Sequence, residues 1–451
     1  MKALLAGTIA FLAPIGAATD LWVGPAGSGL PFTEIQAAVD SAAPGDRIYV
    51  LAGTYGPVTI DRELQLSGEG SGFARIVGFA DDTGAGQPAL TVENVGPPGR
   101  VWINGFELAV DDTATTPSPV LARFSNVSGA IELCDLRVTR DRLDATTPGG
   151  QGAYLSFADC PRVFGSDVRV ASFATDQVAS GPLEPFAALR ATNSTLSFSD
   201  SRFDAAQTPE AQAGIELGGA PAIALESSSL TLGLAMVRGG HRGDQGSDEN
   251  VRAGDGIRAI DSQVRVHGGR SNLIVGGGVN HAAGPGVAAT GAAIRLDETS
   301  SLVYGASVEL SGGQDTNMQF GPAIVAESGA IVDARSDRLP VMWVASPIGQ
   351  LNSFHPVFLE GDVGAVHLWW LALRTQPGLE LPGLDGVWWL GTDFLIPNPA
   401  VVIPDSGIAL DTAFISNSPG LHGLALCYQS LELDGTNVQI APPWFASLEL
   451  P

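Results

Sequence analysis

The chain has 451 residues, of which 45% are hydrophobic and 16% are charged, and its formal net charge is −25. This hydrophobic content is too high for a disordered chain. The acidic excess excludes nucleic acid and anionic membranes as main partners. Lys2 is the only lysine, so a mature chain without it has no Schiff-base lysine and no lysine general base.

The N-terminus predicts a secretory signal peptide at residues 1–18. An apolar stretch from Ala3 to Ala18 follows Lys2, and Gly16-Ala17-Ala18 fits a cleavage site before Thr19. The alternative is a membrane anchor, but the stretch is shorter than the ~20 residues of a spanning helix. We therefore expect export and a secreted or cell-surface location, with no membrane span after cleavage.

Residues 19–57 predict a helical cap and a first strand. Thr33 and Gln36 have the spacing of a capping box, with Thr33 as the N-cap. The helix that follows places Ile35, Ala38 and Val39 on one face, and a strand is expected from Asp46 to Leu51. Such a helix can cover the end of a solenoid, where strand edges and core residues would otherwise be exposed.

Residues 58–340 contain a repeat with a fixed period, which is typical of a solenoid. Successive aliphatic residues lie 34 positions apart, and the series continues at spacings of 37 and 30: Leu121, Leu155, Leu189, Ile223, Ile257, Ile294 and Ile324. Within each repeat, apolar and polar residues alternate as in a strand, and Asn193-Ser194, Ser227-Ser228 and Asp261-Ser262 are turn residues. The pattern predicts an all-β chain, folded as a right-handed parallel β-helix.

The N-terminal segments also resemble a known group of proteins. The stretches Phe32–Asp40, Pro44–Val50 and Ala52–Tyr55 are similar to the entry of the pectate-lyase-like β-helix superfamily. The whole chain resembles secreted β-helix proteins of planctomycete type, and Ser418–Asp434 resembles their Gly- and Leu-rich C-terminal module. This resemblance implies the fold, but the superfamily includes pectin methylesterases, polygalacturonases, polysaccharide lyases and non-enzymatic surface proteins.

Two Gly-rich loops carry the densest group of polar residues. The pairs Gly239-Gly240, Gly268-Gly269 and Gly312-Gly313 each follow a predicted strand, so we expect the loops to project from one side of the solenoid. Arg and carboxylate side chains suit acidic sugars, directly or through Ca²⁺. The alternative is a solvated loop surface with scattered charges. The ligand-binding candidates here are His241, Arg242, Asp244, Asp248, Arg252, Asp255, His267, Arg270 and His281.

Residues 341–451 predict a small C-terminal β-domain. Six of the eight Trp lie in it, including the pairs Trp369-Trp370 and Trp388-Trp389. Neighbours in a strand point to opposite faces, so one Trp of each pair is expected inside and the other outside. Trp369 and Trp388 are therefore further candidates for stacking on sugar rings, against the alternative of a Trp-rich core. The domain can cap the solenoid, bind a ligand or serve in export.

Three cysteines are present, at positions 134, 160 and 427. Cys134 and Cys160 lie in successive predicted coils and either pair as a disulfide or stay as small buried residues. Cys427 is expected to be free and buried. No C-x-x-C metal-ligand spacing is present.

The catalytic signatures of the superfamily's enzymes are incomplete in this chain. Gly313-Gln-Asp-Thr316 matches a fragment of the pectin methylesterase signature, but the rest of that pattern is missing. The sequence therefore favours an exported, non-catalytic protein that binds polysaccharide or another extracellular surface. It implies no cofactor, although the acidic loops could hold a Ca²⁺ ion. The alternatives are a polysaccharide lyase or glycoside hydrolase acting on acidic glycans, with the catalytic residues unknown, and a structural envelope component.

Overall fold

The structure is a computed structural model that describes most of the chain in separate ranges. These are residues 18–69, 74–80, 86–110, 120–140, 153–172, 187–205, 219–241, 253–268, 272–278, 290–315, 317–346, 348–350, 353–373, 375–379, 384–391, 395–415, 425–435 and 437–449. Of the predicted signal peptide, only Ala18 lies inside the described residues. The described chain is all-β, apart from one helix, α1 (Ile35–Ser41).

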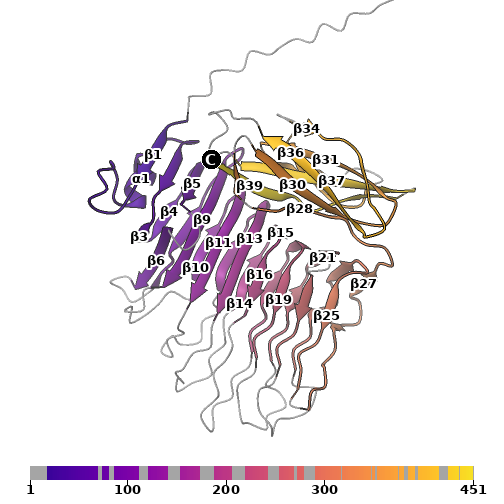
Figure 1. Ribbon diagram of the computed structural model, residues 1–451. Helices are drawn as coiled ribbons and strands as arrows, with labels where there is room; N and C mark the ends of the chain where they lie inside the picture. The colour runs from indigo at the N-terminus through magenta and orange to yellow at the C-terminus, as the bar shows by residue number, and fades with distance from the viewer. Residues whose placement is uncertain are drawn as a thin grey trace, which may run out of the picture.

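The first sheet confirms the predicted parallel β-helix (Figure 1). Its nine strands pair in parallel, each with the corresponding strand of the next coil. They are β4 (Val58–Ile60), β8 (Leu90–Glu93), β10 (Val120–Ser125), β12 (Ala153–Ala158), β14 (Ala187–Thr192), β17 (Ile223–Glu226), β20 (Ile257–Ile260), β23 (Ile294–Leu296) and β26 (Ile324–Ala326).

The aliphatic repeat forms one inward-facing row of this sheet. Leu155, Leu189, Ile223 and Ile257 are register partners in turn, and Ile294 and Ile324 extend the row. At the start of the series the prediction is wrong, because Leu155 lies opposite Ala122 and not Leu121. The coil between them is therefore one residue shorter than the sequence spacing indicates.

The second sheet forms the rest of the coil wall. Its strands are β1 (Asp20–Val23), β2 (Arg47–Val50), β3 (Gly53–Tyr55), β5 (Leu64–Gly68), β6 (Ala74–Ala80), β7 (Gly86–Gln87), β9 (Arg100–Val110), β11 (Ala130–Arg140), β13 (Val163–Ser172), β15 (Thr195–Ser199), β16 (Arg202–Asp204), β18 (Ser229–Gly233), β19 (Met236–Arg238), β21 (Gln263–His267), β22 (Leu273–Val275), β24 (Ser301–Tyr304), β25 (Glu309–Ser311) and β27 (Ile331–Ala334). All its ladders are parallel except that of the β6–β7 hairpin. In successive coils the strand path bends at a residue with positive φ, so this sheet forms two walls of the coil. These residues are Asp135, Asp167, Asp200 and Leu234.

The turns between the two sheets use residues that tolerate the left-handed backbone region. In six successive coils one turn residue has φ between 47° and 59°, and this column contains Asn94, Asn126, Asp159, Asn193, Ser227 and Asp261. A buried serine column follows it. Ser228 Oγ accepts a hydrogen bond from the Ser194 amide at 3.1 Å, and the Ser262 hydroxyl accepts one from the Ser228 amide at 3.0 Å. The predicted turn chemistry is confirmed.

The N-terminal helix covers the first coils, but its start differs from the prediction. Ile35, Ala38 and Val39 of α1 are buried, and the helix contacts β1, β2 and β4. Its N-cap is Glu34, with no side-chain capping bond, so the predicted Thr33 capping box is wrong. Gln36 bonds instead to the backbone of Thr59 in β4: its Oε1 accepts from the amide N at 2.7 Å, and its Nε2 donates to the carbonyl at 3.3 Å. Tertiary contact outcompetes the local cap.

The Gly-Gly pairs form a column that differs from the predicted one in one member. The Gly239 amide donates to Val275 O at 2.9 Å, and the Gly276 amide donates to Ser311 O at 3.0 Å. The column therefore contains Gly239-Gly240, Gly276-Gly277 and Gly312-Gly313. Gly268 instead follows β21 and donates to Leu339 O at 3.1 Å. A Cβ at Gly277 would lie 1.9 Å from the Gly240 carbonyl oxygen, which explains why these positions need glycine.

Residues 341–449 form two largely antiparallel layers, here called the C-terminal module. The outer sheet contains β28 (Val341–Val344), β30 (Ser353–Glu360) and β36 (Ile408–Ile415). The inner sheet contains β29 (Ile348–Gln350), β31 (Val366–Ala372), β34 (Ile396–Pro397), β35 (Val401–Val402), β37 (Ala425–Asp434), β38 (Asn437–Ile440) and β39 (Trp444–Glu449). The hairpin of β32 (Thr375–Leu379) and β33 (Trp388–Leu390) is separate. Met342, Val357 and Trp369 belong to the core between the layers.

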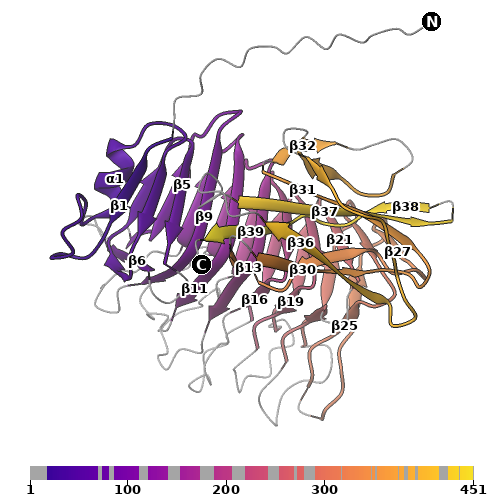
Figure 2. The same cartoon turned by 45° about the horizontal axis from the view of Figure 1, so that its top comes forward.

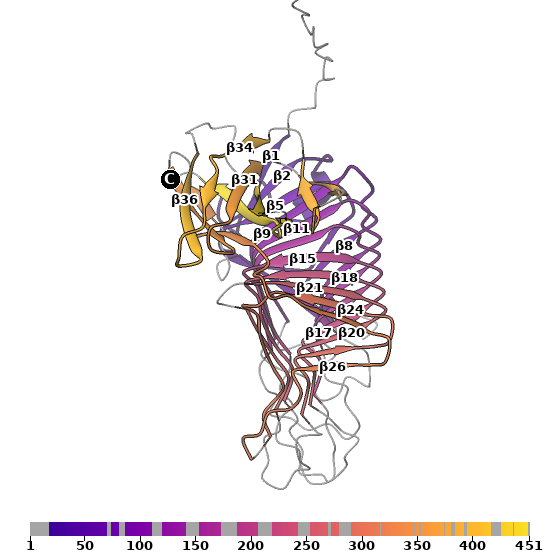
Figure 3. The ribbon, with the colours of Figure 1, turned by 90° about the vertical axis from the view of Figure 1, so that its right-hand side faces the viewer.

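The module packs against the side of the solenoid and does not cap its end (Figures 2 and 3). Strand β39 contacts β11 and β13. Outward-facing Trp102 and Phe164 of the solenoid form a buried cluster with Phe445 and Trp389 of the module. The Phe164 ring centroid is 4.9 Å from that of Trp389 and 5.5 Å from that of Phe445. The module therefore hides solenoid residues that strand alternation alone would place in solvent.

None of the three cysteines forms a disulfide bond and all three are buried, so Cys134 and Cys160 do not pair. Cys134 faces outward beneath the module, where its thiol lies 3.8 Å from the carbonyl oxygen of Phe445. Cys160 belongs to the solenoid core and donates to Ala158 O at 3.3 Å. The two side chains lie on opposite sides of the coil wall. The expectation for Cys427 is confirmed.

Candidate functional site

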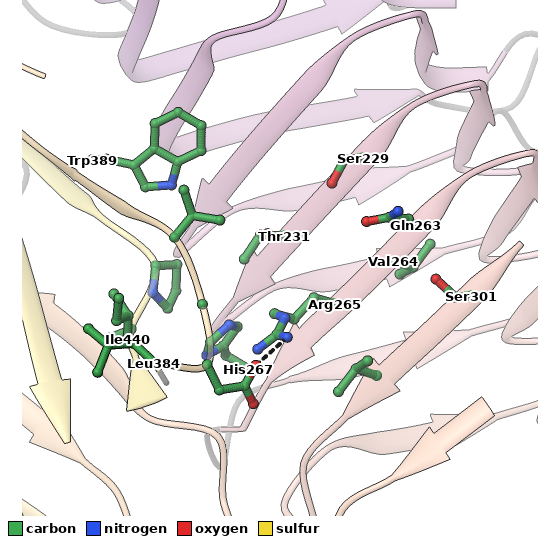
Figure 4. A pocket seen from close by; sticks show the side chains of 16 residues that line it. Ser229, Thr231, Gln263, Val264, Arg265, His267, Ser301, Leu384, Trp389 and Ile440 are labelled. Atoms are coloured by element: carbon green, nitrogen blue, oxygen red, sulfur yellow. Dashed lines mark hydrogen bonds and ion pairs between the residues drawn. The ribbon is translucent and has the colours of Figure 1, made fainter. Parts of the chain in front are cut away.

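A cleft of about 540 Å³ lies between the solenoid and the C-terminal module (Figure 4). Strands β18, β21 and β24 form its floor, and residues 384–387 and 440–442 with Trp389 form its wall. Its volume falls in the range of sites that bind small molecules or short segments of a polymer. The cleft exists because the module folds back along the coils.

The floor is a ladder of polar side chains from successive coils. Ser229, Gln263 and Ser301 are register partners, so their side chains lie in one outward-facing row. Thr231 and Arg265 form the next row. Parallel strands are separated by about 4.8 Å, so hydrogen-bonding groups recur at that interval along the solenoid axis. Gln263 is exposed, while Ser229 and Ser301 are partly exposed.

The floor is joined to the wall by an ion pair. Arg265 Nη2 lies 2.6 Å from Asp385 Oδ1, and Arg335 Nη1 lies 3.1 Å from Asp385 Oδ2. Burial raises the pKa of Asp385, but the hydrogen bond from Arg265 and the two positive charges outweigh burial and hold that pKa below its ordinary value. Asp385 is therefore ionised at neutral pH. Arg265 Nη1 is buried here without a hydrogen-bond partner.

Of the sequence candidates that the structure describes, only His267 lines the cleft. It is fully buried at the end of β21, and its Nδ1 lies 2.9 Å from the carbonyl oxygen of Pro340. Burial, together with the nearby charge of Arg265, lowers its pKa to about 3. The ring is therefore neutral, and it holds the segment that leads from the solenoid to the module.

Two further candidates of the loop group, His241 and Asp255, form hydrogen bonds within the fold. His241 Nδ1 accepts a hydrogen bond from the Gly278 amide at 3.1 Å, and burial lowers the pKa of its imidazole. Asp255 accepts from Arg295 Nε at 2.7 Å and from the Ala292 amide at 2.9 Å. Neither lines the cleft. The candidates that lie outside the described residues are Arg242, Asp244, Asp248, Arg252, Arg270 and His281.

The tryptophan pairs alternate as predicted. Trp369 is fully buried in the module core, where its Nε1 donates to Asp411 at 2.9 Å, and Trp370 is partly exposed. A fully buried ring has no face for a sugar, so Trp369 is not available for stacking. Trp388 is half-buried, and its ring packs edge-on against Trp370 at a centroid distance of 5.0 Å. Its partner Trp389 is buried and lines the cleft.

Sequence reasoning missed Gln263, Arg265 and Asp385. Alternation did indicate that residues 263 and 265 face outward, because Val264 and Val266 between them are apolar. No sequence signal brings Asp385 to this position, because 120 residues separate it from Arg265.

Neither a metal site nor a spanning helix is found in the described part of the chain. No group of three or more His, Cys, Asp or Glu there is arranged to hold a metal ion. No helix in the same ranges has the length and apolarity needed to cross a bilayer.

Comparisons with known proteins do not assign this chain to a family. No protein-family model matches the sequence, and no curated protein matches it significantly. Among solved structures, the chain is similar to the polygalacturonase from Erwinia carotovora ssp. carotovora, with 12% sequence identity and a TM-score of 0.29, over 72% of this chain and 97% of that chain. A similarity this low carries no argument about activity. The assignment as a parallel β-helix rests on the strand pairing of the chain itself.

Proposed function

We propose that this chain is an exported, non-catalytic β-helix protein that binds polysaccharide in the cleft between the solenoid and the C-terminal module. The polar ladder of Ser229, Gln263 and Ser301 supports this proposal. A linear polymer repeats its hydroxyl groups along its length, so it can bond to side chains that recur along the solenoid axis.

The ionisable groups of the cleft support binding over catalysis. A general acid or base needs a pKa near the working pH. Asp385 is held ionised by two arginines, and His267 is held neutral by burial. Both groups are engaged in joining the module to the solenoid.

The proposal is tested with a protein that begins at Thr19. Retention on immobilised pectins, alginate and sulfated glycans, with and without Ca²⁺, identifies the ligand, and calorimetry then gives the affinity. The double variant Gln263→Ala/Ser301→Ala should bind at least about tenfold more weakly, since each hydrogen bond contributes about 1 kcal/mol. Gln319→Ala is the matched control, because Gln319 is also exposed but does not line the cleft.

Three results would count against this function. Equal losses in the double variant and in Gln319→Ala would place binding elsewhere. Release of unsaturated or reducing ends from a glycan by the wild-type protein would establish a lyase or hydrolase. Neither retention nor product release would favour a structural envelope role.

A further inference from the structure

The outer sheet of the C-terminal module is apolar on both faces. Its inward side chains belong to the module core, including Met342, Val357 and Leu359. Alternation places the intervening residues on the opposite face. These outward residues are Val341, Trp343, Phe354, Pro356, Phe358, Glu360, Ile408, Leu410, Thr412 and Phe414.

The outward face carries a band of apolar side chains across all three strands. Phe358 lies opposite both Trp343 and Leu410, and Phe354 lies opposite Phe414. The Trp343 and Phe358 rings are stacked, with centroids 5.1 Å apart and an interplanar angle of 9°. Phe354, Leu410 and Phe414 are exposed by 66%, 61% and 54%. An antiparallel sheet with one solvated face normally has polar residues on that face, so this face has the composition of a covered surface.

The described part of the molecule covers this face only at one end, where Val341 and Glu360 are buried, with exposed fractions of 0% and 2%. The inner sheet lies between the outer sheet and the solenoid, and Figure 3 shows β36 on the side of the module away from the coils. The occupant must therefore come from outside the described chain.

Charge favours a second copy of the chain as the occupant. A twofold contact places each residue opposite residues of the same surface, so charged groups there meet like charges. The molecule carries a net charge of −25, but the one charged residue among these outward positions, Glu360, is only 2% exposed. Self-association through this face therefore avoids like-charge contact. We propose that the outer sheet packs against the same sheet of a second copy, sheet against sheet.

The size of the face sets the expected strength of this dimer. Strands β30 and β36 have eight residues each, and β28 has four. The two long strands are about 27 Å long and β28 about 14 Å, and each strand is about 4.8 Å wide, which gives about 330 Å² of projected face in each copy. This places the contact among small interfaces, which form reversibly. Long-range repulsion between two acidic copies opposes association and is screened by salt.

The experiment is sedimentation velocity or light scattering on the chain from Thr19, at protein concentrations from about 1 to about 200 μM. We expect a monomer–dimer equilibrium that strengthens as NaCl is raised from about 0.05 to about 0.5 M. Leu410→Asp and, independently, Phe354→Asp should weaken dimerisation more than about tenfold, because each places two like charges in the contact. Ile331→Asp is the matched control, because Ile331 is 66% exposed at the last coil of the solenoid, away from this face. Circular dichroism checks that each variant is folded.

The possible results distinguish a second copy of the chain from other partners of this face. Dimerisation that is lost in Leu410→Asp and Phe354→Asp but kept in Ile331→Asp supports the proposal. A wild-type protein that stays monomeric across the whole concentration range overturns the proposal. If, in addition, Leu410→Asp abolishes retention on a glycan, the face binds sugar instead of a second copy. Loss of the dimer in Ile331→Asp alone overturns the proposal as well, because association then uses the open end of the solenoid.

Discussion

Arg265 of the solenoid and Asp385 of the C-terminal module form an ion pair, with Nη2 and Oδ1 2.6 Å apart. The pair spans 120 residues of sequence and joins the floor of the cleft to its wall. Arg335 adds a second positive charge on the same carboxylate. The position of the wall therefore depends on one acidic side chain that two coils hold in place.

Asp385→Asn is expected to destabilise the module's contact with the solenoid by about 1–2 kcal/mol, because it removes the counter-charge of Arg265, which is partly buried, while Arg335 keeps its ion pair with Asp333. The pKa of Asp385 is lowered in the folded state, so its stabilising contribution is present above the unfolded pKa of about 4 and is lost as the pH falls through the folded value. Urea unfolding at pH 7 and at pH 3 measures both effects. A difference between variant and wild type that is as large at pH 3 as at pH 7 would contradict the ionic role.

Phe445→Ala is expected to destabilise the protein by about 3–5 kcal/mol, because it opens a cavity between the module and the solenoid. The ring is fully buried and packs against Trp102 and Phe164. Phe320→Ala is the control, since Phe320 is 61% exposed and its truncation should change stability little. The measurement is the free energy of unfolding in denaturant. Similar losses in the two variants would show that the Phe445 contact contributes nothing specific.

His267 should make stability depend on pH below neutrality. Its pKa is lowered to about 3 in the folded protein, so the unfolded chain binds the extra proton between about pH 6.5 and pH 3. The free energy of unfolding should therefore fall with decreasing pH in this window, by up to about 1.4 kcal/mol per pH unit. In His267→Asn this part of the slope should disappear between pH 6.5 and 5, where few carboxylates titrate. An unchanged slope in the variant would assign the dependence to other groups.

Ser227→Asn is expected to stabilise the solenoid by about 0.5–1 kcal/mol, because Ser227 has a φ of 47° and asparagine adopts this region more readily. Its neighbour gives the contrasting variant. Ser228→Ala should destabilise by about 1–3 kcal/mol, because it leaves the buried amide of Ser194 without its acceptor. Thermal unfolding of both variants is the test. A lower melting temperature for Ser227→Asn would show that losing the hydrogen bond between the Ser227 hydroxyl and Asp261, at 3.1 Å, costs more than the backbone preference of asparagine contributes.

The sequence predicted the solenoid well and the cleft only in part. Coil length, the inward aliphatic row and the turn columns were readable because every coil repeats the same local pattern. The predicted cap at Thr33 was wrong because Gln36 bonds to a neighbouring strand, which a local motif cannot indicate. Of the site candidates, His267 lines the cleft, while Gln263 and Arg265 of the same strand were missed because their polar partners come from other coils and from the module.

The sequence by itself determined the coil, because the partner of each strand lies about 34 residues away and has the same alternation. Only the tertiary structure decided where the C-terminal module lies. Its contacts join residues as distant as Cys134 and Phe445, 311 positions apart, and no period relates them. This packing buries outward-facing Trp102 and Phe164, forms the cleft over β18, β21 and β24, and leaves the apolar face of the outer sheet uncovered. The physical reason is that burial of apolar surface has no preferred direction or sequence separation, so the sequence shows which side chains need cover but not what covers them.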